Sequence, residues 1–377
     1  MLLSFARLSF RYLILLIPGL LLGACGTDGS GTEEEDNPYA PTPYALALPK
    51  NLPQTVTIPA SNPLTVEGVE LGRKLFYEVK LSRTGTQSCG SCHQQSKAFT
   101  DGLAHAVGVE GAPHPRGAMS LANVLWETSL TWDGASTSLE QQARTPIENA
   151  VEMHQLLADG VRKLQQTELY PPLFQKAFGS STITEDNVLK ALAQFERTLI
   201  SANSRYDKYI RKEGTLTRTE QLGLAVFNNH PGEVGGIFIR GGTCHHCHLD
   251  ATGLFSSPDF FNNGLDVAFA DAGRASVTSL ATDRGKFRAP TLRNIALTAP
   301  YMHDGRFQTL EQVLDHYNEH VLVNSPGVDP NVLLSNTPGG THLDLTAAEK
   351  TQLIAFLHTL TDTTFIKDSR FSDPFKP

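Results

Sequence analysis

The chain has 377 residues, of which 40% are hydrophobic and 19% charged, a composition that indicates a globular protein and not a disordered or fibrous one. Its 39 Asp and Glu residues outnumber its 31 Lys and Arg residues, so the formal net charge is −8. This balance excludes the basic surface that nucleic-acid binding requires and suits a basic partner. The length is sufficient for two domains.

Residues 1–25 have the pattern of an export signal. Arg7 and Arg11 lead into the apolar run 12–22, which is too short for a permanent membrane span. The run ends in Leu22-Gly23-Ala24-Cys25, which resembles the bacterial lipobox, where the cysteine becomes the lipidated first residue of the mature protein. We predict a lipoprotein anchored to a membrane through Cys25 and located in the periplasm. Ordinary cleavage that leaves a free thiol is the alternative.

Residues 26–63 are rich in Gly, Glu, Pro, Ser and Thr and are predicted to form a disordered tether. Folding should begin near Leu64, and helical spacing over residues 68–79 leads to the sequence Cys89-Gly90-Ser91-Cys92-His93. The same C-x-x-C-H pattern recurs in the second half of the chain as Cys244-His245-His246-Cys247-His248.

A C-x-x-C-H pattern is the attachment signature of c-type haem. The two thiols can bond to the two vinyl groups of one porphyrin, and the adjacent histidine becomes the proximal iron ligand. A disulfide or a zinc site requires no histidine directly after the second cysteine, and zinc also needs four ligands in one cluster. We therefore predict two covalently bound haem c groups, held by Cys89, Cys92, His93, Cys244, Cys247 and His248.

The two halves of the chain repeat each other. Asn123 is followed by Trp-Asp-Gly at 132–134 and Leu-Glu-Gln at 139–141; Asn294 is followed, at the same spacings, by His-Asp-Gly at 303–305 and Leu-Glu-Gln at 310–312. Helices are predicted after Thr184 and after the capping box Thr346-x-x-Glu349. Hairpin and period-two patterns are scarce, so we predict a mainly α fold in two tandem domains, 64–215 and 216–365, with a tail at 366–377.

The paired haem motifs, the TWDG and YMHDG turns and the LEQ repeats resemble the bacterial di-haem cytochrome c peroxidases and the related MauG enzymes, over about residues 64–361. The resemblance implies two cytochrome c-like domains, with a peroxide-reacting haem in the first and an electron-transfer haem in the second. It also implies hydrogen peroxide as substrate, with a small cytochrome as electron donor or a protein as the oxidised substrate. Members are often dimers, so a homodimer is expected.

Residues 142–153 match the family pattern Q-A-x-x-P-I-x-N-x-x-E-M, which assigns Gln142 and Glu152 to the distal side of the first haem. A carboxylate there can take and return the peroxide proton, and an amide can orient the peroxide. From periodicity alone both would be ordinary surface residues of a helix. Trp132 matches the tryptophan that passes electrons between the haems, with plain core packing as the alternative. Its repeat partner His303 is either a buried structural histidine or a tuning residue.

The resemblance places Tyr317 where the peroxidases carry a methionine that ligates the second haem. MauG-type members carry a tyrosine in the Asp-His-Tyr-Asn setting that residues 315–318 share. Tyrosinate stabilises ferric and higher iron states, whereas thioether favours ferrous iron. The competing ligands are Met302, His316 and His320.

Two loop histidines, His105 and His114, are candidates to cap the first haem, which we expect to be uncapped and five-coordinate. A calcium ion commonly lies between the haems in this family, and its carbonyl ligands would come from Thr298 and Pro300. The family's Asn ligand corresponds to Gly117, and loss of that side-chain oxygen weakens the predicted site.

We therefore predict a di-haem c-type peroxidase that reduces hydrogen peroxide at the N-terminal haem with electrons relayed by the C-terminal haem. One alternative is a MauG-like peroxide-dependent oxidase of a protein substrate. The other is a di-haem electron-transfer cytochrome without peroxidase activity, which would need no acid–base pair such as Glu152 and Gln142.

Overall fold

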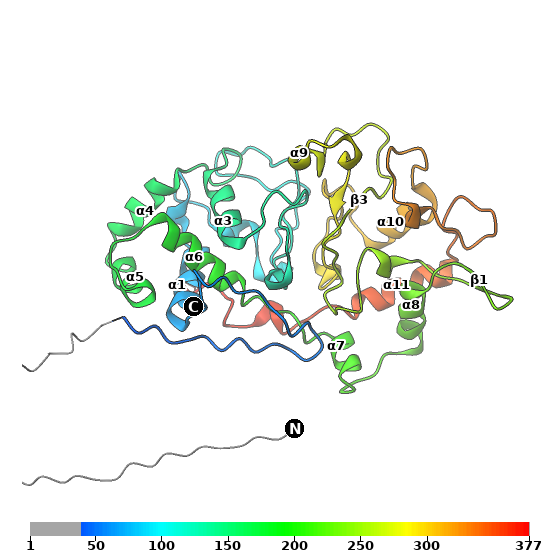
Figure 1. Ribbon diagram of the computed structural model, residues 1–377, viewed down its shortest axis with the longest axis horizontal. Helices are drawn as coiled ribbons and strands as arrows, with labels where there is room; N and C mark the ends of the chain where they lie inside the picture. Colours follow the sequence, from blue (N-terminus) through cyan, green and yellow to red (C-terminus); the bar gives the residue numbers. More distant parts are fainter. Residues whose placement is uncertain (1–38, 377) are drawn as a thin grey trace, which may run out of the picture. The chain divides into compact units, whose positions relative to one another are not determined.

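The computed structural model describes residues 39–376, which are mainly helical with two short two-stranded sheets (Figure 1). The predicted signal segment and the lipidation site Cys25 lie outside the described residues. Among residues 39–376, no helix is both long enough and apolar enough to cross a bilayer. The helices are α1 (Val66–Phe76), α2 (Cys89–Cys92), α3 (Leu139–Glu148), α4 (Leu157–Gln165), α5 (Tyr170–Phe178), α6 (Glu185–Glu196), α7 (Arg205–Ile210), α8 (Arg218–Asn228), α9 (Ala275–Thr278), α10 (Leu310–Asp315) and α11 (Ala347–His358).

The strands are short and antiparallel. Strand β1 (Gly232–Val234) pairs with β2 (Ile237–Ile239), and β3 (Phe260–Phe261) pairs with β4 (Phe287–Arg288). Helices therefore supply nearly all of the regular structure, and the prediction of a mainly α fold is confirmed.

The helix ends follow from local sequence. The Thr184 hydroxyl accepts the Asn187 N–H at the start of α6, and Thr346 with Glu349 forms the predicted capping box at the start of α11. Helix α1 begins after Thr65, whose side chain accepts the Gly68 N–H. These caps satisfy backbone donors that a helix leaves unpaired in its first turn.

The repeat is visible in the packing of two helix pairs, α1 with α6 and α8 with α11 (Figure 1). A Cβ atom on Gly72 would lie 1.9 Å from the Ala191 carbonyl oxygen, and one on Gly223 would lie 1.9 Å from the Gln352 carbonyl oxygen. Only glycine allows the two backbones to approach this closely. Gly72 and Gly223 therefore mark the points where the two helix pairs cross.

Each half has its own apolar core. The rings of Phe76 and Phe195 meet edge to face, 5.3 Å between centroids, in the first half. Phe227 and Phe356 lie 5.3 Å apart in the second half. These four rings are fully buried, and truncating any one of them to Ala would cost about 3–5 kcal/mol of stability.

The segment after residue 364 returns to the first half. Phe365 packs on Phe99 with 5.4 Å between ring centroids, and Phe371 is buried in the same core. Tyr77 donates its hydroxyl to the Phe371 carbonyl at 2.7 Å, and Gln95 donates to the Asp368 carbonyl at 2.8 Å. Residue 365 was expected to end the second domain and residues 366–377 to form a tail, but Phe365 and Phe371 complete the N-terminal core because both side chains are large and apolar.

Residues 39–63 also differ from the expectation of a free tether. Leu52 is buried, the Asn51 amide donates to Asp207 at 2.6 Å, and the Pro53 carbonyl accepts the Trp126 indole N–H at 3.1 Å. Asn62 is buried and donates to Glu140 at 2.7 Å. A composition rich in Pro and Thr gave no indication of these few anchoring residues.

Candidate haem centres

Both C-x-x-C-H motifs lie on short helical turns. Cys89–Cys92 forms α2, where the Ser91 hydroxyl accepts the Ser88 N–H at 3.0 Å, and residues 244–246 form one 3₁₀ turn. One turn brings the first and fourth residues of a motif to the same side and delivers the histidine that follows. The four cysteines of the described chain are unpaired and partly buried, so their thiols remain free to bond to porphyrin.

Each motif histidine is oriented by a backbone carbonyl. The His93 Nδ1 lies 2.8 Å from the Phe99 carbonyl oxygen, and the His248 Nδ1 lies 3.1 Å from that of Pro290. Burial lowers the pKa of His93 and lowers that of His248 to about 4, so both rings are neutral. A neutral ring that donates from Nδ1 presents its Nε2 lone pair, the arrangement an iron ligand requires.

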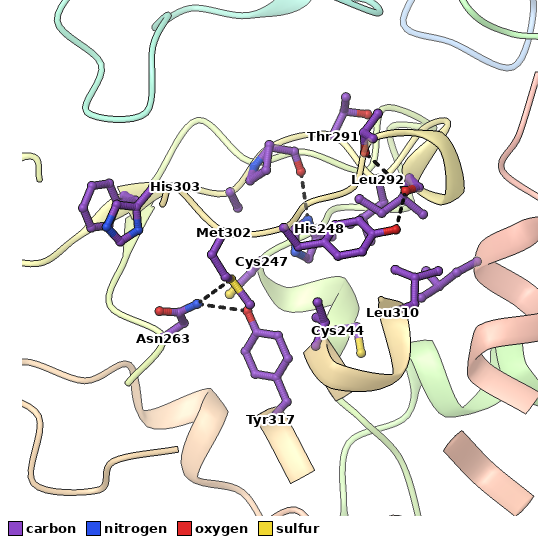
Figure 2. Close-up of a pocket in the computed structure, with 18 of the residues that line it drawn as sticks. Cys244, Cys247, His248, Asn263, Thr291, Leu292, Met302, His303, Leu310 and Tyr317 are labelled. Atoms are coloured by element: carbon purple, nitrogen blue, oxygen red, sulfur yellow. Dashed lines mark hydrogen bonds between the residues drawn. The ribbon is translucent and has the colours of Figure 1, made fainter. Parts of the chain in front are cut away.

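The second motif opens into a largely apolar cavity (Figure 2). The cavity is lined by Cys244, Cys247 and His248 from the motif and by Tyr317 from a π-helical turn at residues 316–320. Apolar side chains form most of the remaining wall, among them Phe227, Ile295, Leu310, Leu314, Leu353 and Leu357. A planar apolar macrocycle with a metal at its centre fits this donor set and this wall.

Several candidate axial ligands approach this cavity. Tyr317 and Met302 line it, and one amide, that of Asn263, donates to the Tyr317 oxygen at 3.3 Å and to the Met302 sulfur at 3.4 Å (Figure 2). His316 instead contacts the Asn263 carbonyl through its Nε2 at 3.0 Å, and His320 is exposed. Neither of these two histidines lines the cavity, so of the four predicted candidates only Tyr317 and Met302 do.

Glu152 of the predicted distal pair lies within electrostatic reach of the first motif. Burial, and then the charges of Asp101 and Glu152, raise the pKa of the Cys92 thiol to about 11. Glu152 follows α3 in a turn and accepts the Asn149 amide at 2.7 Å. Gln142 is on α3, and its buried Oε1 atom has no hydrogen-bond partner among the described residues. An orphaned amide oxygen can accept a hydrogen bond from a small polar ligand.

The two loop histidines have other partners. His105 is exposed and contacts the His114 carbonyl through its Nδ1 at 3.0 Å. His114 lines a separate cavity formed by residues of both halves, and its Nδ1 lies 2.9 Å from the Arg116 carbonyl. These contacts turn both rings toward their own loop.

Trp132 lies on the cavity wall where the two halves meet. Its indole N–H donates to the Gly117 carbonyl at 2.9 Å, and the Arg288 N–H donates to its backbone carbonyl at 2.8 Å. His303, at the equivalent turn, is buried and stacks on Phe287 with ring centroids 3.8 Å apart. Burial lowers its pKa, so the ring is neutral.

Arg116 joins the halves beside this tryptophan. Its guanidinium donates to Asp133 at 2.6 Å and forms two hydrogen bonds to Asp271, at 2.7 and 2.9 Å. These carboxylates hold the pKa of Arg116 above its usual value, and Arg116 lowers the pKa of both acids despite their burial. The backbone of the Trp132 turn is thereby fixed to the second half.

Thr298 and Pro300, the predicted calcium ligands, line the same cavity as Gly117. Among residues 39–376, no cluster of three or more His, Cys, Asp or Glu side chains could hold a metal, so a cation would depend on carbonyl oxygens. Asp101 also lines this cavity and is buried, and its Oδ2 has no partner among the described residues. A carboxylate is a ligand that calcium prefers.

The sequence pattern did not indicate Asn263, Arg116 or Asp101. Asn263 and Arg116 act through partners 17 to 155 positions away in the chain, and no local periodicity reports such contacts. Asp101 follows the first haem motif closely, and its position in a short polar turn was the one available signal.

The two motifs, the oriented histidines and the apolar cavity define a c-type haem protein. A family profile described as di-haem cytochrome c peroxidase matches residues 66–215. The methylamine utilization protein MauG of Methylorubrum extorquens is 36% identical over 312 residues, 82% of each chain. The cytochrome c551 peroxidase of Nitrosomonas europaea is 34% identical over 270 residues, which is 68% of this chain and 75% of that protein.

A crystal structure described as a MauG-like protein associated with microbial copper homeostasis agrees in fold, with a TM-score of 0.77 and 38% identity. The match covers 88% of this chain and 100% of that one. The chain belongs to the di-haem cytochrome c peroxidase and MauG family. The predicted family and the prediction of an oxidoreductase enzyme are therefore confirmed, and membership implies two c-type haems.

Proposed function

We propose that the protein is a MauG-like enzyme that reduces hydrogen peroxide at the first haem and takes the two electrons from a protein substrate by way of the second. The observation that supports this branch is Tyr317, whose phenol lines the second haem cavity at the position where peroxidases carry methionine. A phenolate ligand disfavours ferrous iron and hence ordinary electron delivery from a cytochrome.

The bound haems supply the redox chemistry, in which one peroxide, two protons and two electrons give two waters. The residues of the chain orient the peroxide and transfer its proton. We assign Gln142 to orient peroxide through its unpartnered amide and Glu152 to carry the proton from the inner to the outer peroxide oxygen. The Asn149 amide holds Glu152 by one oxygen and leaves the other free. Trp132 lies on the path between the halves.

The finer organisation is part of the same proposal. Residues 64–215 and 216–365 form two cytochrome c-like domains with one haem each, and the first haem is uncapped because His105 and His114 have loop partners. The mature protein is a periplasmic lipoprotein anchored at Cys25 and forms a homodimer. The relative associated with copper homeostasis makes a copper-handling protein the first substrate class to test.

A peroxidase that receives its electrons from a cytochrome is the second candidate, and the net charge of −8 favours it because an acidic surface suits a basic cytochrome.

One experiment distinguishes the two candidate functions: the all-ferric holoprotein is mixed with one equivalent of peroxide in a stopped-flow spectrometer. Rapid change at both Soret bands supports the MauG-like reaction. Reaction only after one electron has been added supports the reductively activated peroxidase. No reaction in either state supports the third hypothesis, a di-haem electron-transfer cytochrome without peroxidase activity.

A further inference from the structure

Three side chains meet in one corner of the second haem cavity (Figure 2). The Asn263 amide nitrogen lies 3.3 Å from the Tyr317 oxygen and 3.4 Å from the Met302 sulfur. An amide nitrogen carries two hydrogens, so it can donate to both atoms at once. Tyr317 and Met302 both line the cavity that contains His248, and each carries an atom that can ligate haem iron.

The backbone of Asn263 is held by two neighbouring contacts. Its carbonyl contacts the buried His316, one residue before Tyr317, at 3.0 Å. Its neighbour Asn262 is buried, donates to the Ser325 hydroxyl at 2.9 Å and accepts the Gly264 N–H at 2.9 Å. The backbone that carries the Asn263 amide is therefore fixed to the turn that carries Tyr317.

Met302 is held in a less favourable conformation. Its φ angle is 71°, in the left-handed region that a residue with a side chain rarely adopts. The turn around Gly305, whose N–H donates to the Met302 carbonyl at 3.3 Å, fixes this backbone. The sulfur is directed to Asn263 from an anchored backbone.

We propose that Asn263 is a positioning residue that selects Tyr317 over Met302 as the ligand of the second haem. The inference rests on the proposed assignment of Tyr317. Sulfur and oxygen each keep a further lone pair for iron when they accept one hydrogen bond, but the two bonds differ in strength. Thioether sulfur is a weak acceptor, whereas a hydrogen bond to a phenolate oxygen is charge-assisted, so the Asn263 amide stabilises the phenolate more and fixes its direction. One amide thus restrains the competing ligand and aims the selected one.

The selection has a functional consequence. Thioether ligation raises the reduction potential of a haem, and phenolate ligation lowers it. This protein has a phenol, Tyr317, and a thioether, Met302, in one cavity. The neutral Asn263 amide determines which of the two ligates the second haem, and hence whether its potential is low or high.

The test compares Asn263→Leu, which removes both N–H groups at similar volume, with the matched control Asn331→Leu. Asn331 lines the same cavity, but its amide donates to Asp329. The ferric holoproteins are examined by EPR and by the red-edge charge-transfer band of thioether-ligated ferric haem, and the second haem is titrated for its potential. We expect Asn263→Leu to gain the thioether band and an upward shift in potential, and Asn331→Leu to show neither.

The double variant Asn263→Leu/Met302→Leu should lose the band again, which would identify Met302 as its source. A wild-type spectrum and potential for Asn263→Leu would overturn the proposal. If Asn263→Leu does not incorporate haem, Asn263→Ser, which can donate to only one of the two atoms, is read in the same way. The wild-type spectrum tests the Tyr317 assignment separately: a thioether band there would overturn that assignment, whatever the variants show.

Discussion

Trp132 and His303, the equivalent residues of two repeated turns, are connected by hydrogen bonds through the backbone of one residue, Gly117. The Trp132 indole N–H donates to the Gly117 carbonyl at 2.9 Å, and the Gly117 N–H donates to the His303 carbonyl at 3.0 Å. The residue next to Gly117 is Arg116, which binds acids of both halves. The orientation of the indole is thus determined by contacts with both repeats.

Replacing Trp132 by Phe should keep the packing and remove the aromatic N–H that fixes the ring. We expect oxidation of the second haem by peroxide to slow by about tenfold or more, equivalent to ~1.4 kcal/mol of activation free energy, while peroxide binding at the first haem is unchanged. Stopped-flow absorbance at the two Soret bands measures both steps. Trp126→Phe, which alters an indole bonded to Pro53, is the control and should leave both rates unchanged.

Glu152→Gln should lower peroxide turnover by about 10²–10⁴-fold, because an amide cannot transfer the peroxide proton. Haem content and the ferric spectrum should be retained, since the substitution preserves shape. Steady-state peroxide consumption provides the measurement. Glu148→Gln, an exposed acid on the preceding helix, should retain turnover. Equal activity of the two variants would remove the proposed role of Glu152.

Arg116→Ala should destabilise the protein by about 2–3 kcal/mol, because Asp133 and Asp271 would lose charged hydrogen bonds in a mostly buried position. Arg116→Lys should recover only part of this loss, since an ammonium cannot form the two-point contact with Asp271. Urea unfolding of the holoprotein, followed by far-UV circular dichroism, gives both values. The exposed Arg370→Ala should stay within about 0.5 kcal/mol of wild type.

Stability should fall at acid pH through Glu349. Its hydrogen bonds to Arg240 lower the pKa of Glu349 from 4.5 to about 2. A carboxyl whose folded-state pKa is depressed stabilises the fold above its unfolded-state pKa and loses that contribution as the pH falls through the folded-state value. We expect wild type to lose this contribution between about pH 4.5 and pH 2 and Glu349→Gln to lack it, in unfolding curves recorded across that range. Parallel pH dependences would contradict the prediction.

Calcium binding should depend on Asp101. Asp101→Asn is expected to weaken calcium binding by about tenfold or more, because a charged ligand is lost. Gly117→Asn should strengthen binding by restoring a side-chain oxygen, although its Cβ would lie 3.3 Å from the Ala104 carbonyl oxygen. Isothermal titration of chelator-treated holoprotein with calcium measures both affinities. Unchanged affinity in Asp101→Asn would show that Asp101 is not a ligand.

Local signals predicted the parts of the fold that depend on neighbouring residues. The caps at Thr184 and Thr346 were predicted because a capping side chain bonds to backbone only three residues ahead. The repeat predicted that Asn123 and Asn294 are equivalent, and both adopt left-handed backbone with φ of 63° and 60°. The return of Phe371 to the first core, in contrast, joins residues almost 300 positions apart, and no sequence window contains both.

The same distinction applies to the site. Cysteine spacing defines haem attachment because the chemistry requires adjacent residues. The competition between Tyr317 and Met302 depends on Asn263, more than 50 positions before the tyrosine. Its neighbours in the sequence indicate only a polar turn.

The return of Phe365 and Phe371 to the first core also sets an order of assembly. The N-terminal half is synthesised first, yet its apolar core stays incomplete until residues 365–371 have been made. Haem attachment to Cys89 and Cys92 can therefore precede closure of the fold around them. The enzymes that attach haem would then act on an open polypeptide at this first site, and the packing of Phe365 and Phe371 would complete the core around it.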